Sequence, residues 1–291
     1  MTYHQPVLLD EVLNFFQPKE GLAILDCTLG NGGHTLEFLK KGATVFGLDD
    51  DPINLEITTK RIKKEKLDKR FHPISGNFSN LNQIYSRHIK IPLDALFADL
   101  GLSRNQQVST KRGFSYSDTD SLDMRLNPKK QKLTAEEIIN TWDKFQLYNL
   151  FTKYSQEKLA KPLVFEIIQA RQKKPITTGI QLATIIENYY QKKHYRSKIN
   201  PSTKIFMSLR IAVNNEFNNL QKLLNTSQKI VRKDGKIGII TFHSGEDRIV
   251  KNFLQKNKIK SNKFSASYSE IKRNPLSRSA MFRCFINHDT K

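Results

Sequence analysis

The chain has 291 residues, of which 48 are lysine or arginine and 28 are aspartate or glutamate, so its formal net charge is +20. Its 38% hydrophobic content excludes an intrinsically disordered chain, and no apolar run approaches the roughly 20 residues that cross a bilayer. The two cysteines, Cys27 and Cys284, do not have metal-ligand spacing, so we expect no metal site and no disulfide framework. The first residues do not form a signal peptide, and we expect a cytoplasmic protein with no membrane partner.

Short apolar runs alternate with helical patterns over the first hundred residues. Strands are predicted at 23–28, 44–49, 71–75 and 94–100, and helices at 35–41, 52–65 and 81–88. Strands that alternate with helices form right-handed crossovers and therefore a parallel sheet. The strand pattern resumes at 236–243, followed by a helix at 247–256 and strands at 263–268 and 280–287.

The intervening region has no strand pattern. Thr134 with Glu137 and Thr178 with Gln181 have the spacing of capping boxes, and Pro162 is predicted to be the first residue of a helix. A long helix is expected to open at 200–201 and to carry apolar residues at helical spacing from 205 to 224. We therefore expect a discontinuous α/β domain (residues 1–105 and 205–291) split by an inserted all-helical domain (residues 106–204).

A glycine-rich turn, Gly30-Asn-Gly32-Gly33-His34, follows the first strand. Glycines allow positive φ and let the backbone approach a ligand closely. The second strand ends in Asp49, where a carboxylate would accept hydrogen bonds from the ribose of an adenosine cofactor. A nicotinamide dinucleotide would need glycine where Thr35 stands. A purely structural strand–helix turn is the alternative.

Asp26-x-x-x-Gly30-x-Gly32 resembles the first motif of class I S-adenosylmethionine-dependent methyltransferases. Asp99 lies at the end of the fourth predicted strand, at the edge where open α/β sheets bind ligands. Asp99 could alternatively cap the loop that follows it.

Further motifs extend this resemblance over nearly the whole chain. In order, they are His4-x-Pro6-Val-Leu-Leu-Asp10-Glu11, Gly30-x-Gly-Gly-His34, Asp99-Leu-Gly-Leu-Ser103, Arg112-Gly-Phe-Ser115, Leu122-Asp-Met-Arg125, Leu209-Arg-Ile-Ala-Val-Asn214 and Phe242-His-Ser-x-Glu-Asp-Arg-Ile-Val-Lys251. Together they are similar to those of the bacterial family that methylates N4 of a cytidine in the decoding region of 16S rRNA. Each motif alone is weak, but their joint order is specific.

The resemblance implies a class I, Rossmann-like methyltransferase with S-adenosylmethionine as cofactor. Its motifs place the cofactor at Gly32, Gly33, His34, Asp49, Phe78, Asp99 and Gln106. The sequence departs from the family pattern in two loops that are expected to bind the target RNA. Ser103-Arg104 replaces a Ser-Ser pair, and Asn274-Pro-Leu-Ser-Arg278-Ser279 lacks one arginine.

Methyl transfer from a sulfonium requires in-line alignment of the acceptor nitrogen, and hydrogen-bond acceptors near that amine favour the reaction. Asp99 is the candidate catalytic residue, with His243 as a second polar candidate after the strand at 236–243. His243 could equally be a satisfied polar group at a strand end. Methylation at C5 of cytosine would need a poised cysteine, and neither Cys27 nor Cys284 lies in a suitable loop.

The positive charge is unevenly distributed. Residues 1–100 hold 12 basic and 13 acidic side chains, whereas residues 101–291 hold 36 and 15. The excess favours a polyanionic partner, with 16S rRNA in the small ribosomal subunit or its precursor as the partner that the resemblance implies. The substrate-binding candidates are Arg112, Arg248 and Arg278; basic pairs at 111–112, 129–130, 173–174, 192–193 and 272–273 are further contacts, although any single pair could be a solvated helix face.

Two other interpretations remain open at this stage. The chain could be a class I methyltransferase of another nucleic acid or of a protein, or a non-catalytic RNA-binding factor of ribosome assembly on the same fold. The intact set from Gly32 to Gln106 argues against the second. The oligomeric state is not predicted.

Overall fold

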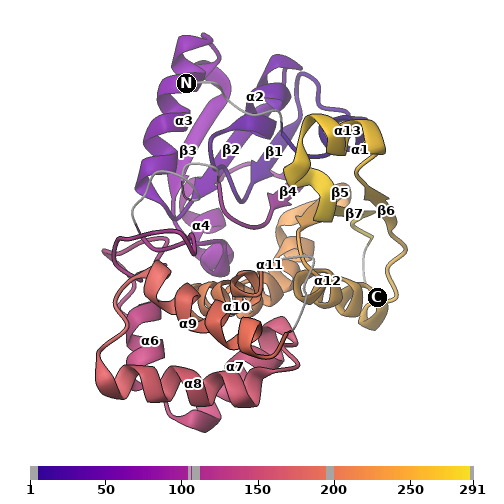
Figure 1. Cartoon of the computed structure of the whole chain (residues 1–291). Coiled ribbons are helices and arrows are strands. Elements are labelled where there is room, and N and C mark those ends of the chain that lie inside the picture. The colour runs from indigo at the N-terminus through magenta and orange to yellow at the C-terminus, as the bar shows by residue number, and fades with distance from the viewer. Residues whose placement is uncertain (1–5, 104–105, 107–111, 195–199, 289–291) are drawn as a thin grey trace. The chain divides into compact units, whose positions relative to one another are not determined.

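The computed structural model describes residues 6–103, 106, 112–194 and 200–288. Two compact units make up the chain (Figure 1): Met1–Ser103 with Phe217–Lys291, and Arg104–Glu216. The first is an α/β unit and the second is helical.

A seven-stranded sheet organises the first unit, in the order β3-β2-β1-β4-β5-β7-β6. Strands β1 to β5 pair in parallel, and β7 is antiparallel to both of its neighbours. The mostly parallel, Rossmann-like sheet that the sequence predicts is thus confirmed. The strands are β1 (Ala23–Asp26), β2 (Thr44–Asp49), β3 (Phe71–Ser75), β4 (Leu93–Asp99), β5 (Val231–Thr241), β6 (Asn262–Ser265) and β7 (Met281–Ile286).

Helices cover both faces of this sheet because its strands carry apolar side chains on both sides. On one face, α1 (Leu9–Phe16), α2 (Gly33–Lys40) and α3 (Pro52–Lys64) pack over Ile24, Val45 and Phe97. On the other face, α4 (Leu81–His88), α11 (Glu216–Ile230) and α12 (Ser244–Lys256) pack over Leu25, Leu48 and Leu96. The chain then adds α13 (Tyr268–Arg273) and the short helix η3 (Pro275–Ser279) before β7.

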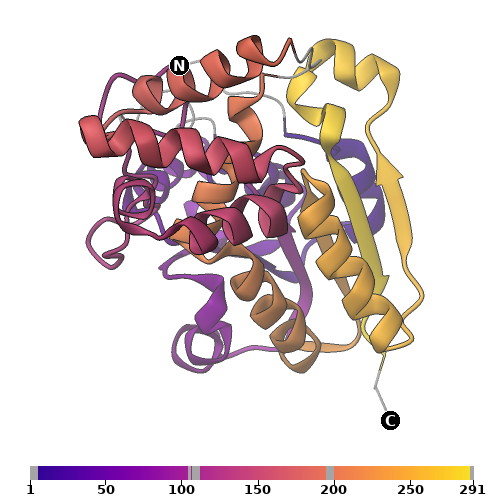
Figure 2. The same cartoon turned by 60° about the horizontal axis from the view of Figure 1, so that its bottom comes forward.

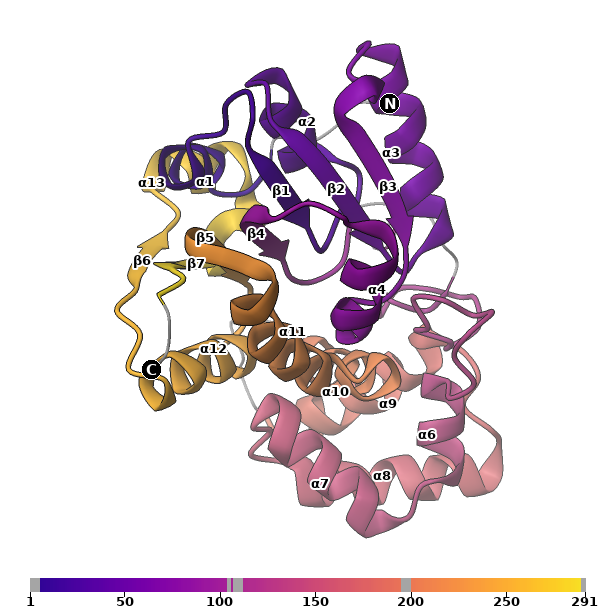
Figure 3. The same ribbon diagram turned by 180° about the vertical axis from the view of Figure 1, so that it is seen from behind.

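Three carboxylates lie at one edge of the sheet. Asp26, Asp49 and Asp99 are the last residues of β1, β2 and β4, three strands that run in parallel and are neighbours in the sheet, as Figure 3 shows from behind. We call this the carboxyl edge.

The second unit is built on helices α6 (Ala135–Thr141), α7 (Lys144–Ser155), α8 (Ala160–Lys173), α9 (Gly179–Lys192) and α10 (Ser202–Asn214), coloured magenta to orange in Figure 2. Their facing sides enclose a separate apolar core, which includes Ile138, Phe151, Leu163, Ile186 and Leu209.

The second unit ends later than the inserted domain that the sequence predicts, at Glu216 rather than at 204. Ile205, Phe206 and Leu209 explain the difference, because these residues of α10 pack into the core of the second unit. The expectation of one long helix through Leu224 was wrong. Asn215 adopts a left-handed conformation, with φ 51°, so α10 ends there and α11 begins at Glu216.

Helix starts were predicted with mixed success. Thr178 and Gln181 form the reciprocal capping box that their spacing predicts, and Thr134 Oγ1 accepts a hydrogen bond from the Glu137 amide at 3.0 Å. Pro162 is not the first residue of its helix, because α8 already begins at Ala160. Proline is tolerated there since the first-turn amides have no partner within the helix.

None of the helices in the described ranges is long and apolar enough to cross a membrane.

Candidate functional site

The glycine-rich turn joins β1 to α2 at the carboxyl edge. Gly30 and Gly32 have φ values of 50° and 71°, a conformation that residues with a Cβ rarely adopt. A Cβ on Gly32 would overlap the Thr58 side chain, and one on Gly33 would lie 2.8 Å from Pro6 Cγ. Glycine is therefore required for this close approach of α2 to its neighbours.

Asp26 is buried directly beneath this turn. Its two carboxylate oxygens accept hydrogen bonds from the Thr28 amide, at 3.1 Å, and from Thr35 Oγ1, at 2.7 Å. Burial raises the pKa of Asp26 to about 6, although both hydrogen bonds oppose that rise. Asp26 is thus a carboxylate that changes charge near neutral pH.

Asp49 accepts hydrogen bonds from three groups around the turn. Its Oδ2 accepts from the Gly30 amide, at 2.8 Å, and from Asn54 Nδ2, at 3.2 Å, while Oδ1 accepts from the Asp51 amide, at 2.8 Å. Enclosure by the protein raises its pKa to about 7. The spacing from Gly30 to Asp49 that the sequence singles out is therefore a direct contact.

Phe78 begins the short helix η2 (Phe78–Asn80), which follows β3. Asn77 fixes its position, because Asn77 Oδ1 accepts from the Ser79 amide at 2.9 Å and Nδ2 donates to Asp50 Oδ2 at 3.1 Å. The ring is partly buried against the core on the α4 side of the sheet. Phe78 thus follows the end of β3, the strand that pairs with β2 and with its last residue, Asp49.

Asp99 and His34 face each other across the carboxyl edge. Asp99 Oδ2 lies 3.6 Å from His34 Nδ1, and Asp99 Oδ1 is inaccessible to solvent and has no hydrogen-bond partner among the described residues. Burial, with the negative charges of Asp26 and Glu246 adding to it, raises the pKa of Asp99 well above its ordinary value.

His34 is a buried neutral imidazole. Its Nε2 donates to the Val7 carbonyl oxygen at 2.9 Å, because a carbonyl oxygen only accepts. Burial lowers the pKa of His34 to about 4, and its ring packs against Phe97 with the centroids 4.7 Å apart. The unprotonated Nδ1 therefore points to Asp99.

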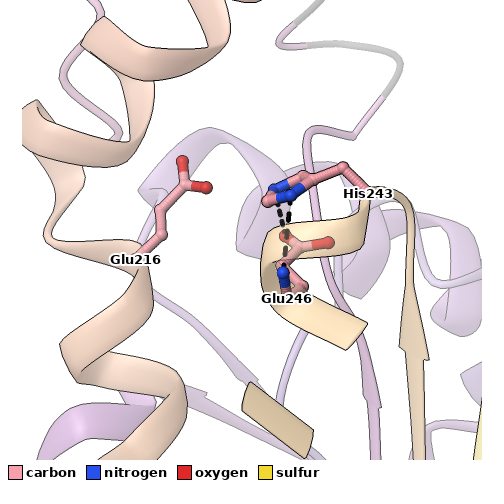
Figure 4. Close-up of side chains that lie close together, drawn as sticks. All are labelled: Glu216, His243 and Glu246. Atoms are coloured by element: carbon pink, nitrogen blue, oxygen red, sulfur yellow. Dashed lines mark hydrogen bonds and ion pairs between the residues drawn. The ribbon is translucent and has the colours of Figure 1, made fainter. Parts of the chain in front are cut away.

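His243 follows β5 and forms the N-cap of α12. Its Nδ1 accepts a hydrogen bond from the Glu246 amide at 3.4 Å, and its Nε2 lies 3.3 Å from Glu246 Oε1 (Figure 4). The cap explains why α12 begins at Ser244, earlier than the predicted 247. Both ring nitrogens of His243 thus face one residue, Glu246. Glu246 is buried, and its Oε2 accepts from the Phe242 amide at 2.9 Å.

The predicted substrate-binding arginines have different surroundings. Arg248 on α12 and Arg278 in η3 are exposed. Arg112, in the second unit, donates to the carbonyl oxygens of Arg125 and Leu126 at 3.0 and 2.8 Å, so it also holds a loop together.

Other residues singled out by the sequence lie in the second unit or outside the described residues. Gln106 is buried in that unit. Asp123 and Arg125, from the Leu-Asp-Met-Arg motif, form a two-pronged ion pair at 2.7 Å. His4, Arg104 and Lys111 lie outside the described residues.

Two acidic groups of the site were not chosen from the sequence as site residues. Asp26 was visible as the first residue of the glycine motif, and Glu246 stands inside the motif that follows β5. Their burial identifies them, because an acidic side chain is rarely buried without a reason.

The cysteines provide no nucleophile near this edge. Cys27 and Cys284 are both buried. Burial raises the pKa of the Cys27 thiol well above its ordinary value and that of Cys284 to about 12, whereas a nucleophilic cysteine reacts as the thiolate. Both behave as small apolar core residues.

Residues 1–288 match the MraW methylase family. The chain belongs to this family. The expected resemblance to a methyltransferase family is thereby confirmed, and the MraW methylase match covers the strands and helices of both units.

Relatives of this MraW-family chain extend over most of its length. It is 38% identical to the ribosomal RNA small subunit methyltransferase H of Persephonella marina, over 97% of this chain and 98% of that protein. It is 41% identical to the protein of the same name from Halothermothrix orenii, over 86% of this chain and 80% of that one. A solved methyltransferase from Streptococcus mutans, in complex with SAH, aligns over 98% of this chain and 99% of that one with a TM-score of 0.49 and 10% identity.

Proposed function

We propose that this MraW-family methylase transfers a methyl group from S-adenosylmethionine to N4 of a cytidine in the decoding region of 16S rRNA, within the small ribosomal subunit or its precursor. The observation that carries this proposal is the carboxyl edge, where Asp26, Asp49 and Asp99 surround a glycine turn in a chain of this family. The relatives named ribosomal RNA small subunit methyltransferase H support the class of RNA.

The side chains at this edge fit the proposed cofactor chemically. S-adenosylmethionine supplies an electrophilic methyl group on a sulfonium and also carries an ammonium group, so it is cationic at its reactive end. Buried carboxyl groups with raised pKa values, such as Asp26 and Asp99, are stabilised in their ionised form by a nearby cation. The partnerless Oδ1 of Asp99 is an acceptor that a bound ligand could satisfy.

The remaining proposed contacts follow from position. Gly32 and Gly33 stand at the start of α2, where the amides of the first turn are the proposed contacts for the cofactor. Asp49 presents carboxylate oxygens for ribose hydroxyls at the end of β2, and Phe78 presents a ring on which adenine can stack. Gln106 is part of the same proposal through the family pattern alone.

Activation of the acceptor amine is assigned to Asp99. The lone pair of a cytosine amine is delocalised into the ring, and an acceptor of its N–H hydrogen bond localises that pair and disperses the developing positive charge. His243 remains the second polar candidate, with its ring held by Glu246.

The test is to map the modified nucleotides by mass spectrometry of rRNA from cells with and without the gene. We expect one cytidine of the decoding region to lose a methyl group at N4 when the gene is absent, and to regain it with the wild-type gene but not with a D99A copy. Methylation in vitro of a small-subunit particle, but not of DNA, checks the substrate class. A modification at C5, or an unchanged rRNA, contradicts the proposal.

A further inference from the structure

One peptide group connects the carboxyl edge to the C-terminal part of the first unit. The carbonyl oxygen of Val7 accepts from His34 Nε2 at 2.9 Å, and the amide of Leu8, which belongs to the same peptide group, donates to Glu270 Oε1 at 2.8 Å. Glu270 lies on α13, more than 260 positions further along the chain. Figures 1 and 3 both show α13 beside α1.

The segment that carries this peptide is held tightly. Pro6 packs on Gly33, so closely that a Cβ there would lie 2.8 Å from its ring. Leu8 is fully buried and has a φ of 54°, which is unusual for a branched side chain. A strained, enclosed backbone of this kind persists only where its surroundings determine it, and here they include His34 on one side and Glu270 on the other.

The segment on the far side of this connection exposes three cations. Residues 268–279, which we call the C-terminal cationic segment, comprise α13 and η3 and expose Lys272, Arg273 and Arg278. Tyr268, at its start, is the most exposed large hydrophobic side chain among the described residues, at 84%. Exposed cations next to an aromatic ring suit an RNA with unpaired bases.

Glu270 differs from its neighbours in this segment. It is the segment's single acidic residue and it is partly buried. Its carboxylate accepts from the Leu8 amide, and among the described residues it forms no ion pair with a cation of the segment. Ser267 caps the helix by accepting from the Glu270 amide at 3.2 Å, which fixes the start of α13. The Glu270 carboxylate therefore binds the N-terminal segment, through the Leu8 amide.

We propose that Glu270 is a positioning residue which, through the Val7–Leu8 peptide and His34, couples binding at the carboxyl edge to the placement of the C-terminal cationic segment on RNA. This inference rests on the proposed function, since it assumes a cofactor at the edge and RNA at the segment. A ligand that contacts Asp99 or the start of α2 alters the surroundings of His34, and the peptide group transmits that change to Glu270 and α13. By linkage, RNA held by the segment changes cofactor affinity by the same factor.

The experiment measures this coupling by binding alone, with the full chain. The dissociation constant of a 16S rRNA fragment spanning the decoding region is determined with and without saturating S-adenosylhomocysteine, for the wild type, E270A and E270Q. We expect S-adenosylhomocysteine to tighten RNA binding about five-fold or more in the wild type and to have almost no effect in E270A. In E270Q most of the coupling returns, because the amide oxygen of glutamine also accepts the Leu8 hydrogen bond.

E56A is the matched control, since Glu56 is an exposed glutamate of helix α3 paired only with Lys60 in the contacts described for it. Its coupling ratio should equal that of the wild type. Unfolding by denaturant is measured on the same variants, because a merely structural role for Glu270 lowers stability and leaves the ratio unchanged.

Three results overturn the inference: a wild-type ratio near one, a ratio in E270A equal to the wild type, or a loss in E270Q as complete as in E270A. Methyl transfer to the fragment is assayed separately. A wild-type protein that shows the coupling but methylates no RNA contradicts the proposed function and leaves the coupling established.

Discussion

Two segments of the chain build one sheet but differ in net charge. Residues 1–103 contribute β1 to β4 and hold 12 basic and 13 acidic side chains, whereas residues 217–291 contribute β5 to β7 and hold 16 and 5. The first segment provides the turn and the three carboxylates of the carboxyl edge, and the second provides exposed cations. One sheet would thus support both the proposed site for a small cationic cofactor and the proposed surface for RNA.

The largest effect is expected for Asp99 in the first segment. D99A should lower kcat about 10²- to 10³-fold, because it removes the acceptor assigned to the amine in an enclosed site. The measurement is single-turnover methylation of a small-subunit particle with saturating cofactor. D99N tests whether an uncharged acceptor of similar shape restores part of the rate. Normal turnover in D99A with normal cofactor affinity would remove Asp99 from the mechanism.

D49A should lower cofactor affinity and leave RNA affinity unchanged when RNA binding is measured without cofactor. D49A is expected to lower the affinity for S-adenosylmethionine about 10- to 100-fold, as measured by calorimetry. This is the range for the loss of a hydrogen bond to a charged group together with the local disorder that follows. D68A, at an exposed aspartate after α3, serves as the control. If D49A lowered RNA affinity, measured without cofactor, as much as cofactor affinity, the assignment of separate roles to the two segments would fail.

Cofactor affinity should fall as the pH falls. In the ligand-free protein the pKa of Asp49 is raised to about 7 and that of Asp26 to about 6, so both are largely neutral at pH 5.5 and ionised at pH 8. Because the ionised forms favour a cation and accept hydrogen bonds better, binding must release protons below pH 7.

We expect affinity to fall about ten-fold or more from pH 8 to pH 5.5, with the upper part of the change absent in D49N. The pKa of His34 is lowered to about 4, so His34 stays neutral across this window. An affinity independent of pH would contradict the raised pKa values.

The smallest effects are expected in the second segment. Replacing Lys272, Arg273 or Arg278 singly by alanine should weaken RNA binding a few-fold, reduce the slope of log affinity against log salt by about one for each phosphate contact, and leave cofactor affinity unchanged. K63A, from exposed Lys63 on α3, should alter neither. Salt-independent RNA binding would contradict the role given to the cations.

The carboxyl edge could be predicted because it depends on local sequence and on strand order. Asp49 and Asp99 lie at the ends of predicted strands with a continuous apolar pattern, and parallel neighbours bring such ends together. Asp26 was visible only as the first residue of the glycine motif, because the first strand was predicted to continue to residue 28. The turn at Gly30 and Gly32 was predictable for the same reason, since positive φ selects glycine.

Contacts between distant parts of the chain could not be predicted. The Glu270–Leu8 hydrogen bond depends on β7 returning beside β5, and no periodicity encodes which carboxylate will reach which amide. The helix break at Asn215 was missed because the apolar residues of α10 and α11 have continuous helical spacing although they pack into different cores.

The split of the first unit has a consequence for its synthesis. β4 pairs with β5 along most of its length, yet residues 104–216 are made between them. During synthesis, one edge of β4 therefore has no partner strand until the whole helical unit has been made. Pairing between strands so far apart in the sequence is slow. A nascent chain that stops before β5 leaves one side of β4, an apolar strand, without a partner strand at the edge of its sheet, which makes such fragments prone to aggregate.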